Sequence, residues 1–117
     1  MPRSAQMYLW DARDAADAIA DFLTGLDDPT YKQSQLIRAA VERKFEIVGE
    51  ALAQLSKLDP QLAARIPELR EIVGFRNILI HGYASIDHDR VLANAREKLP
   101  ALRDVIDGLL NDLEGRK

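Results

Sequence analysis

Arg76-Asn77-Ile78-Leu79-Ile80-His81-Gly82-Tyr83 is the stretch around which this chain is organised. Counted from Leu69, the side chains that recur every three or four residues are apolar with one exception, a spacing typical of one face of an α-helix. The positions of this stripe are Leu69, Ile72, Val73, Arg76, Leu79, Ile80 and Tyr83. Arg76 therefore stands where the pattern requires an apolar residue. Its guanidinium must be paired or face a cleft, because burying it alone is costly.

Helical spacing also dominates the chain before this stretch. We expect a first helix capped by Ser4 and ended near Gly25, followed by a long second helix from about Pro29 to Leu58 with Asp28 as its N-cap. The second helix carries a wide apolar face, made of Leu36, Ile37, Ala40, Val41, Phe45, Ile47, Val48, Ala51, Leu52 and Leu55. So wide a face favours packing against several helices or against a second subunit.

The helix that carries the motif should begin at Pro67, with Glu68 favourable in its first turn. A short turn or helix starting at Asp59-Pro60 and ending near Ile66 precedes it. His81 falls in the last turn, and Gly82 is expected to end the helix in the left-handed conformation.

After the motif, Asp87 is expected to cap the final helical segment, and Pro100 to kink or restart it. No stretch shows the alternation typical of strands. The prediction is one domain, residues 1–117, folded as an all-α up-down bundle of four or five helices.

Composition excludes several classes of protein. The 117 residues include no cysteine and two histidines, so neither a disulfide framework nor a thiolate metal site is possible. No membrane span or signal peptide is visible, and we expect a cytoplasmic protein. The formal net charge of −3 argues against a broadly basic nucleic-acid surface, so any contact with nucleic acid needs a local basic patch.

The motif contains the groups needed to cut RNA without a metal ion. A histidine such as His81 can take the proton from a 2′-hydroxyl, and an arginine such as Arg76 can stabilise the charge that builds on the phosphate. Asn77 could orient the imidazole or donate to a phosphate oxygen. The plainer alternative is that His81 caps helix carbonyls while Arg76 pairs with a core glutamate.

Two further assignments stay open at this level. Glu46 and Glu50 either form a surface ladder with Arg43 or turn inward, one of them holding Arg76. We expect Trp10 to be a core or interface aromatic and His88 to be a surface residue in the first turn of its helix.

Arg76 and His81 lie about 140° apart around an ideal helix, so they cannot share one face. Either the helix ends early enough to swing His81 round, or a complete site draws on two copies of the motif across a two-fold axis.

The motif Arg76-x4-His81-x-Tyr83 resembles the Arg-x(4–6)-His signature of HEPN domains, in the tyrosine-bearing form of HepT-type toxins (DUF86). Three further elements of that family have counterparts here, in the same order. They are Val48-Gly49-Glu50-Ala51, Gly74-Phe75-Arg76-Asn77 and Leu99-Pro100-x-Leu102. Val48 stands where isoleucine is usual and Phe75 where methionine is common. Neither departure touches the expected chemistry.

The resemblance implies a homodimeric helical bundle acting as a metal-independent endoribonuclease toxin of a type VII toxin–antitoxin pair, with no cofactor. Arg76 and His81 would be catalytic, with Asn77 and Glu50 in support. The partner would be an MntA-like nucleotidyltransferase antitoxin that uses ATP to attach AMP to Tyr83. Two alternatives remain: a non-catalytic substrate-binding subunit of a nucleotidyltransferase, and a dimeric helical scaffold.

Overall fold

The computed structural model describes residues 3–82 and 85–115. Its helices are α1 (Ala5–Leu23), α2 (Asp28–Gln33), α3 (Gln35–Leu58), α4 (Pro60–Ala63), α5 (Leu69–His81), α6 (His88–Ala93) and α7 (Leu99–Gly115), with a π-helical turn at Asn94–Lys98. The described residues contain no strand, and the predicted all-α bundle is confirmed. None of their helices has the length and apolar character to cross a membrane.

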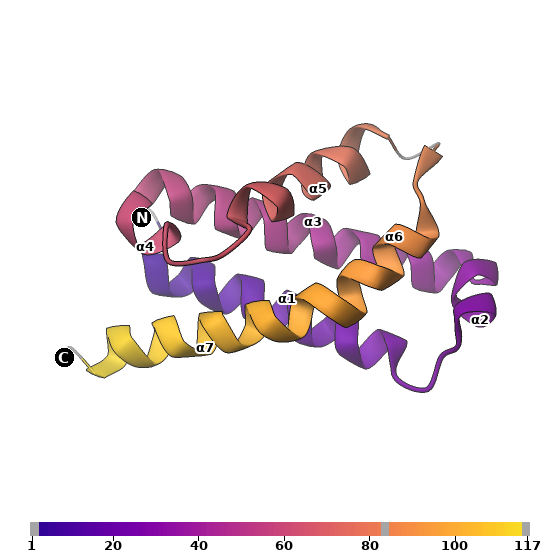
Figure 1. Ribbon diagram of the computed structural model, residues 1–117, viewed down its shortest axis with the longest axis horizontal. Helices are drawn as coiled ribbons and strands as arrows, with labels where there is room; N and C mark the ends of the chain where they lie inside the picture. The colour runs from indigo at the N-terminus through magenta and orange to yellow at the C-terminus, as the bar shows by residue number, and fades with distance from the viewer. Residues whose placement is uncertain (1–2, 83–84, 116–117) are drawn as a thin grey trace.

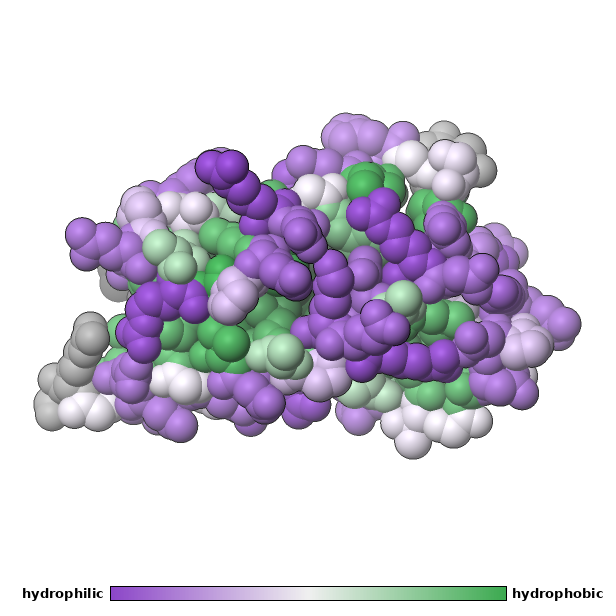
Figure 2. Space-filling model, in the orientation of Figure 1, coloured by the Kyte–Doolittle hydropathy of each residue, from purple (hydrophilic) through white to green (hydrophobic). Residues whose placement is uncertain are grey.

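The bundle is built on the antiparallel pair α1 and α3, as Figure 1 shows. Helix α5 returns along α3, and α7 packs along α1. The largest fully buried side chains come from α1, α2, α3, α6 and α7: Leu9, Ile19, Tyr31, Val41, Val48, Leu52, Leu55, Val91 and Ile106. The face in Figure 2 is mostly hydrophilic, with apolar surface gathered between the start of α5 and α7.

The predicted caps hold at two helices and shift at a third. Ser4 Oγ accepts a hydrogen bond from the Met7 amide (3.2 Å), and Asp87 caps α6, as expected. The N-cap of α2, however, is Asp27 rather than Asp28, and it accepts from the Thr30 amide at 2.8 Å. Pro29 is tolerated in this first turn because the amides there have no partner within the helix.

The predicted single helix from Pro29 to Leu58 is wrong, because Ser34 divides it into α2 and α3. Ser34 leaves the helical conformation (ψ 100°), and its hydroxyl accepts from the Ile37 amide at 3.2 Å, which starts a new helix. Because the chain turns at Ser34, the residues of α3 do not continue the helical spacing of α2. Leu36, expected in the core seam, is consequently 81% exposed.

The start and the stripe of α5 also differ from expectation. Glu68 adopts a left-handed conformation (φ 61°), so the helix begins at Leu69 rather than at Pro67. Phe75 and Leu79 are its buried residues, while Ile80 is 41% exposed. The predicted stripe therefore holds at Leu69, Ile72 and Leu79, which are buried or packed against the core, and fails at Ile80.

Glycine ends α5, but for a different reason from the one expected. Gly82 has φ −112°, outside the left-handed region. A Cβ at this position would lie 2.8 Å from the carbonyl oxygen of Ile78, so the residue is needed for close approach of the chain.

The disturbance expected at Pro100 takes the form of the π-helical turn just before it. The Leu99 amide donates to the Asn94 carbonyl, five residues back. Proline has no amide hydrogen and its ring crowds the carbonyl four residues earlier, and a wider turn accommodates both.

Candidate active site

Arg76 lies against α3 because Gly49 leaves room for it. A Cβ at Gly49 would lie 2.5 Å from Arg76 Cβ, 3.1 Å from Cγ and 3.2 Å from Cδ. Carbon atoms of neighbouring side chains normally stay about 3.5–4.0 Å apart. Gly49 is buried, and because it has no side chain, the aliphatic part of Arg76 can pass across α3 at this position.

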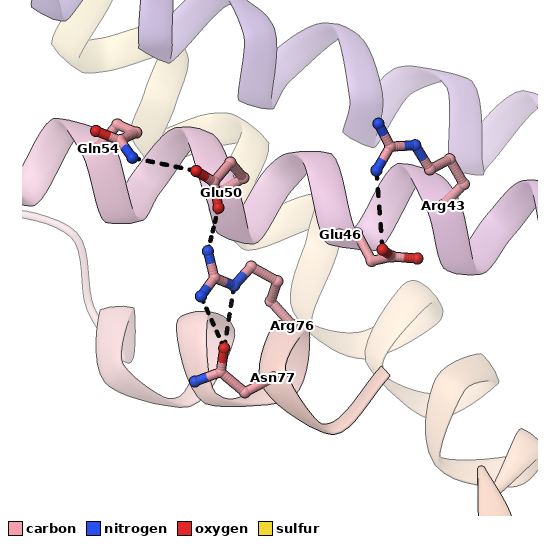
Figure 3. Close-up of polar contacts among 6 residues, drawn as sticks. All are labelled: Arg43, Glu46, Glu50, Gln54, Arg76 and Asn77. Atoms are coloured by element: carbon pink, nitrogen blue, oxygen red, sulfur yellow. Dashed lines mark hydrogen bonds and ion pairs between the residues drawn. The ribbon is translucent and has the colours of Figure 1, made fainter. Parts of the chain in front are cut away.

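The guanidinium of Arg76 is held on two sides, as Figure 3 shows. Its Nη1 donates to Glu50 on α3 in a salt bridge. Its Nε and Nη2 both donate to Asn77 Oδ1, at 3.2 and 2.8 Å. The side chain is only 22% exposed, so the arginine on the apolar stripe is indeed paired.

Glu46 and Glu50, whose roles the sequence left undecided, form different ion pairs. Glu50 binds Arg76, whereas Glu46 faces Arg43 at 3.8 Å in a surface pair. Both alternatives for this edge of α3 are therefore realised, by different residues (Figure 3).

Glu50 is itself supported from its own helix. Gln54 Nε2 donates to Glu50 Oε1 at 3.1 Å. This hydrogen bond, followed by the positive charge and hydrogen bonding of Arg76, lowers the pKa of Glu50. The carboxylate therefore stays charged beside the guanidinium. Sequence reasoning missed Gln54, although its position four residues after Glu50 places both on one helical face.

Asn77 faces Arg76 rather than His81. Its carbonyl oxygen accepts both N–H bonds on one edge of the guanidinium, so it fixes the plane of that group. The contacts given by Asn77 and Glu50 use three of the five N–H bonds of an arginine. Asn77 itself is exposed, and its amide nitrogen can donate to an incoming ligand.

His81 is the last residue of α5 and is exposed. Because α5 stays helical from Arg76 through His81, early termination does not swing the imidazole round. The two side chains therefore diverge by about 140° around the axis. The structure brings Glu50, Asn77 and Arg76 together and does not bring His81 to the side of α5 that carries Arg76. Tyr83 lies outside the described residues.

His88, expected at the surface, is instead half-buried. Its Nε2 lies 3.1 Å from Arg38 Nη1, and its Nδ1 lies 3.9 Å from Glu42. The expectation failed because the side chain of His88 contacts two residues in the first turns of α3. Trp10 is partly buried against the core, with the Arg13 guanidinium 5.0 Å from its ring centre. Among residues 3–82 and 85–115 no three His, Cys, Asp or Glu side chains cluster as metal ligands would.

Comparison with known proteins identifies the family of this chain. The family model described as "Ribonuclease HepT-like" matches residues 12–109. "Putative RNase MJ1380" of Methanocaldococcus jannaschii is 30% identical over 90% of this chain and 95% of its own. "Probable ribonuclease HepT" of Thermococcus cleftensis is 30% identical over 88% of this chain and 93% of its own.

"Putative RNase MJ1216" of the same Methanocaldococcus species is 27% identical over 97% of this chain and 93% of its own. No solved structure matches significantly. With the family model spanning most of the bundle, the chain belongs to the HepT-like ribonuclease family.

Proposed function

We propose that this protein is a metal-independent endoribonuclease toxin in which Arg76 and His81 carry the chemistry. The observation that supports it most is the state of Arg76: a half-buried cation on an apolar helix, oriented by Glu50 and Asn77, with part of its donor set left for a ligand. Such a preorganised fork of donors suits a phosphate.

The reaction we propose is an attack of an RNA 2′-oxygen on the adjacent phosphorus. The imidazole of His81 accepts the 2′-hydroxyl proton as the new oxygen–phosphorus bond forms. The bond from phosphorus to the 5′-oxygen breaks, and that oxygen takes up a proton as it leaves. The guanidinium of Arg76 stabilises the negative charge that builds on the non-bridging oxygens.

A composite site between two copies of the chain would resolve the divergence of Arg76 and His81. In a two-fold dimer the motifs of both protomers face one cleft. Each protomer would then supply an arginine and a histidine, so that one imidazole can act as base and the other as acid. The two arginines would also form a local basic patch on a protein with a net charge of −3.

Two substitutions test the chemistry. His81→Ala and Arg76→Ala should each lower the rate of RNA cleavage by about 10²–10⁴-fold and abolish toxicity. Circular dichroism should show both variants folded. EDTA should leave cleavage by the wild-type protein unchanged. His88→Gln is the matched control at the other histidine, and it should cleave RNA like the wild type at temperatures where it is folded. Full toxicity of His81→Ala would refute the mechanism.

We further propose that the protein pairs in the cytoplasm with an MntA-like nucleotidyltransferase antitoxin, which modifies Tyr83. The phenolic oxygen would attack the α-phosphorus of ATP, forming a tyrosyl-AMP bond and releasing pyrophosphate, while the phenolic proton passes to a base. Tyr83 comes two residues after His81, so the added phosphodiester would compete with RNA phosphate for Arg76.

Mass spectrometry tests this control step. Protein co-expressed with its nucleotidyltransferase should gain the mass of one or more AMP groups on Tyr83 and lose ribonuclease activity. Tyr83→Phe should escape modification and stay toxic, and Tyr8→Phe serves as the control. AMP found only elsewhere would exclude this mechanism. Normal growth on expressing the chain alone would favour a non-catalytic binding subunit.

A further inference from the structure

A second feature lies beside the candidate site, in the groove between α3 and α5. This groove of about 390 Å³ is lined by Ala53, Ser56, Lys57, Leu69, Arg70, Val73, Gly74 and Asn77. Asn77 belongs to both features, because its carbonyl oxygen holds Arg76 while its side chain lines the groove. The groove is therefore continuous with the candidate active site.

Helix geometry gives the groove a direction. Lys57 is seven residues after Glu50 on α3, and Arg70 is seven residues before Asn77 on α5. Seven residues are two helical turns, so each pair shares a face and is about 10.5 Å apart along its helix. Since α3 and α5 are antiparallel, Lys57 and Arg70 line the same end of the groove, two turns from Arg76.

The two cations at this end of the groove have no carboxylate partner among the described residues. Most described lysines and arginines pair with a carboxylate: Arg3, Arg13, Lys32, Arg43, Arg65, Arg76, Arg96, Lys98 and Arg103. Lys57 and Arg70 are exposed and make no ion pair with the described residues. An anion bound at this end of the groove would give both side chains a partner.

We propose that Lys57 and Arg70 bind the phosphate backbone of the RNA substrate along this groove, next to the scissile phosphate at Arg76. Ser56 and Asn77 also line the groove, and their hydroxyl and side-chain amide add neutral hydrogen-bond donors for the backbone. The apolar wall formed by Ala53, Leu69 and Val73 cannot form hydrogen bonds to the edges of bases, so we expect this contact to be independent of the RNA sequence. The inference rests on the proposed ribonuclease function and assigns the path of the strand on one protomer.

Binding to a fluorescently labelled single-stranded oligoribonucleotide tests the path. Measured by anisotropy on a His81→Ala background, which leaves the RNA uncut, adding Lys57→Ala and Arg70→Ala should raise Kd roughly 2- to 30-fold, the range for two exposed ion pairs. The slope of log Kd against log salt should fall by about 0.7 for each lost contact. The charge-conserving pair Lys57→Arg and Arg70→Lys should restore both quantities.

Kinetics on the active protein provide a second measurement. The double alanine variant should raise KM while the rate at saturating RNA stays within about twofold of wild type, because the groove binds RNA without touching the reacting atoms. Lys44→Ala removes the same charge from α3 outside the groove and should change neither Kd nor KM. Unchanged Kd and salt slope in the double variant would overturn the proposed path. Cleavage that persists in Arg76→Ala and His81→Ala would instead refute the proposed function.

Discussion

The contact between Gly49 and Arg76 gives the sharpest test of the candidate site. In Gly49→Ala, the added Cβ would lie 2.5 Å from Arg76 Cβ, where about 3.5 Å is the normal minimum. Arg76 Cβ is bonded directly to the backbone of α5, so a change of rotamer cannot relieve the clash. The two helices must separate by about 1 Å, and the guanidinium moves away from Glu50 with them.

Two opposing terms set the change in the free energy of unfolding. Overpacking in a close contact costs about 1–3 kcal/mol, whereas replacing glycine by alanine within a helix contributes about 1 kcal/mol of stability. Gly108→Ala in α7 isolates the second term, because a Cβ there meets nothing within 4 Å. The two variants should therefore differ by about 1–3 kcal/mol, with Gly108→Ala more stable than the wild type.

Urea unfolding followed by circular dichroism measures this difference, and single-turnover cleavage of RNA measures its consequence. A displacement of about 1 Å of a group that positions substrate can cost about 10²-fold in rate, so Gly49→Ala should be folded and nearly inactive. Gly108→Ala should cleave like the wild type. If Gly49→Ala gains as much stability as Gly108→Ala, or keeps full activity, the close approach of Arg76 to α3 is not what prepares the site.

Three further predictions concern assembly and titration. Light scattering at micromolar concentration should find a homodimer whose interface exceeds about 1,000 Å² in total, and a monomer would contradict the composite cleft. Burial raises the pKa of Tyr31 to about 12, and stability present below the unfolded value near 10 should be lost as the pH rises towards 12, by up to about 3 kcal/mol. Tyr31→Phe should abolish that loss in urea unfolding at pH 8 and 11, and an unchanged alkaline loss would exclude this residue as its source. Gln54 and Arg76 lower the pKa of Glu50, so stability from this carboxylate is present above its unfolded pKa and lost as the pH falls through the folded value. Gln54→Ala should shift that loss to higher pH, measured as a raised Glu50 pKa by carboxyl NMR, and an unchanged pKa would refute the role of Gln54.

Local features of the sequence were sufficient for the fold class and for several boundaries. Helical period, the caps at Ser4 and Asp87, and the disturbance near Pro100 depend on residues within one or two turns, so they can be read without knowing the rest of the molecule. The error at Leu36 is local too: the side-chain cap at Ser34 outweighed a continuous apolar pattern and left Leu36 in solvent.

The sequence alone determined that Arg76 needed a partner, since a guanidinium on an apolar stripe is too costly to bury alone. Only the tertiary structure decided that Glu50 is that partner and that Glu46 is not. Both carboxylates lie on one edge of α3, and the level at which Arg76 meets that helix selects between them. Arg76 meets α3 at Gly49, whose missing side chain allows the close approach next to Glu50. Arg76 and Glu50 are 26 residues apart, so their contact depends on how the faces of α3 and α5 fit together. The helical spacing of apolar residues within either helix does not determine that fit.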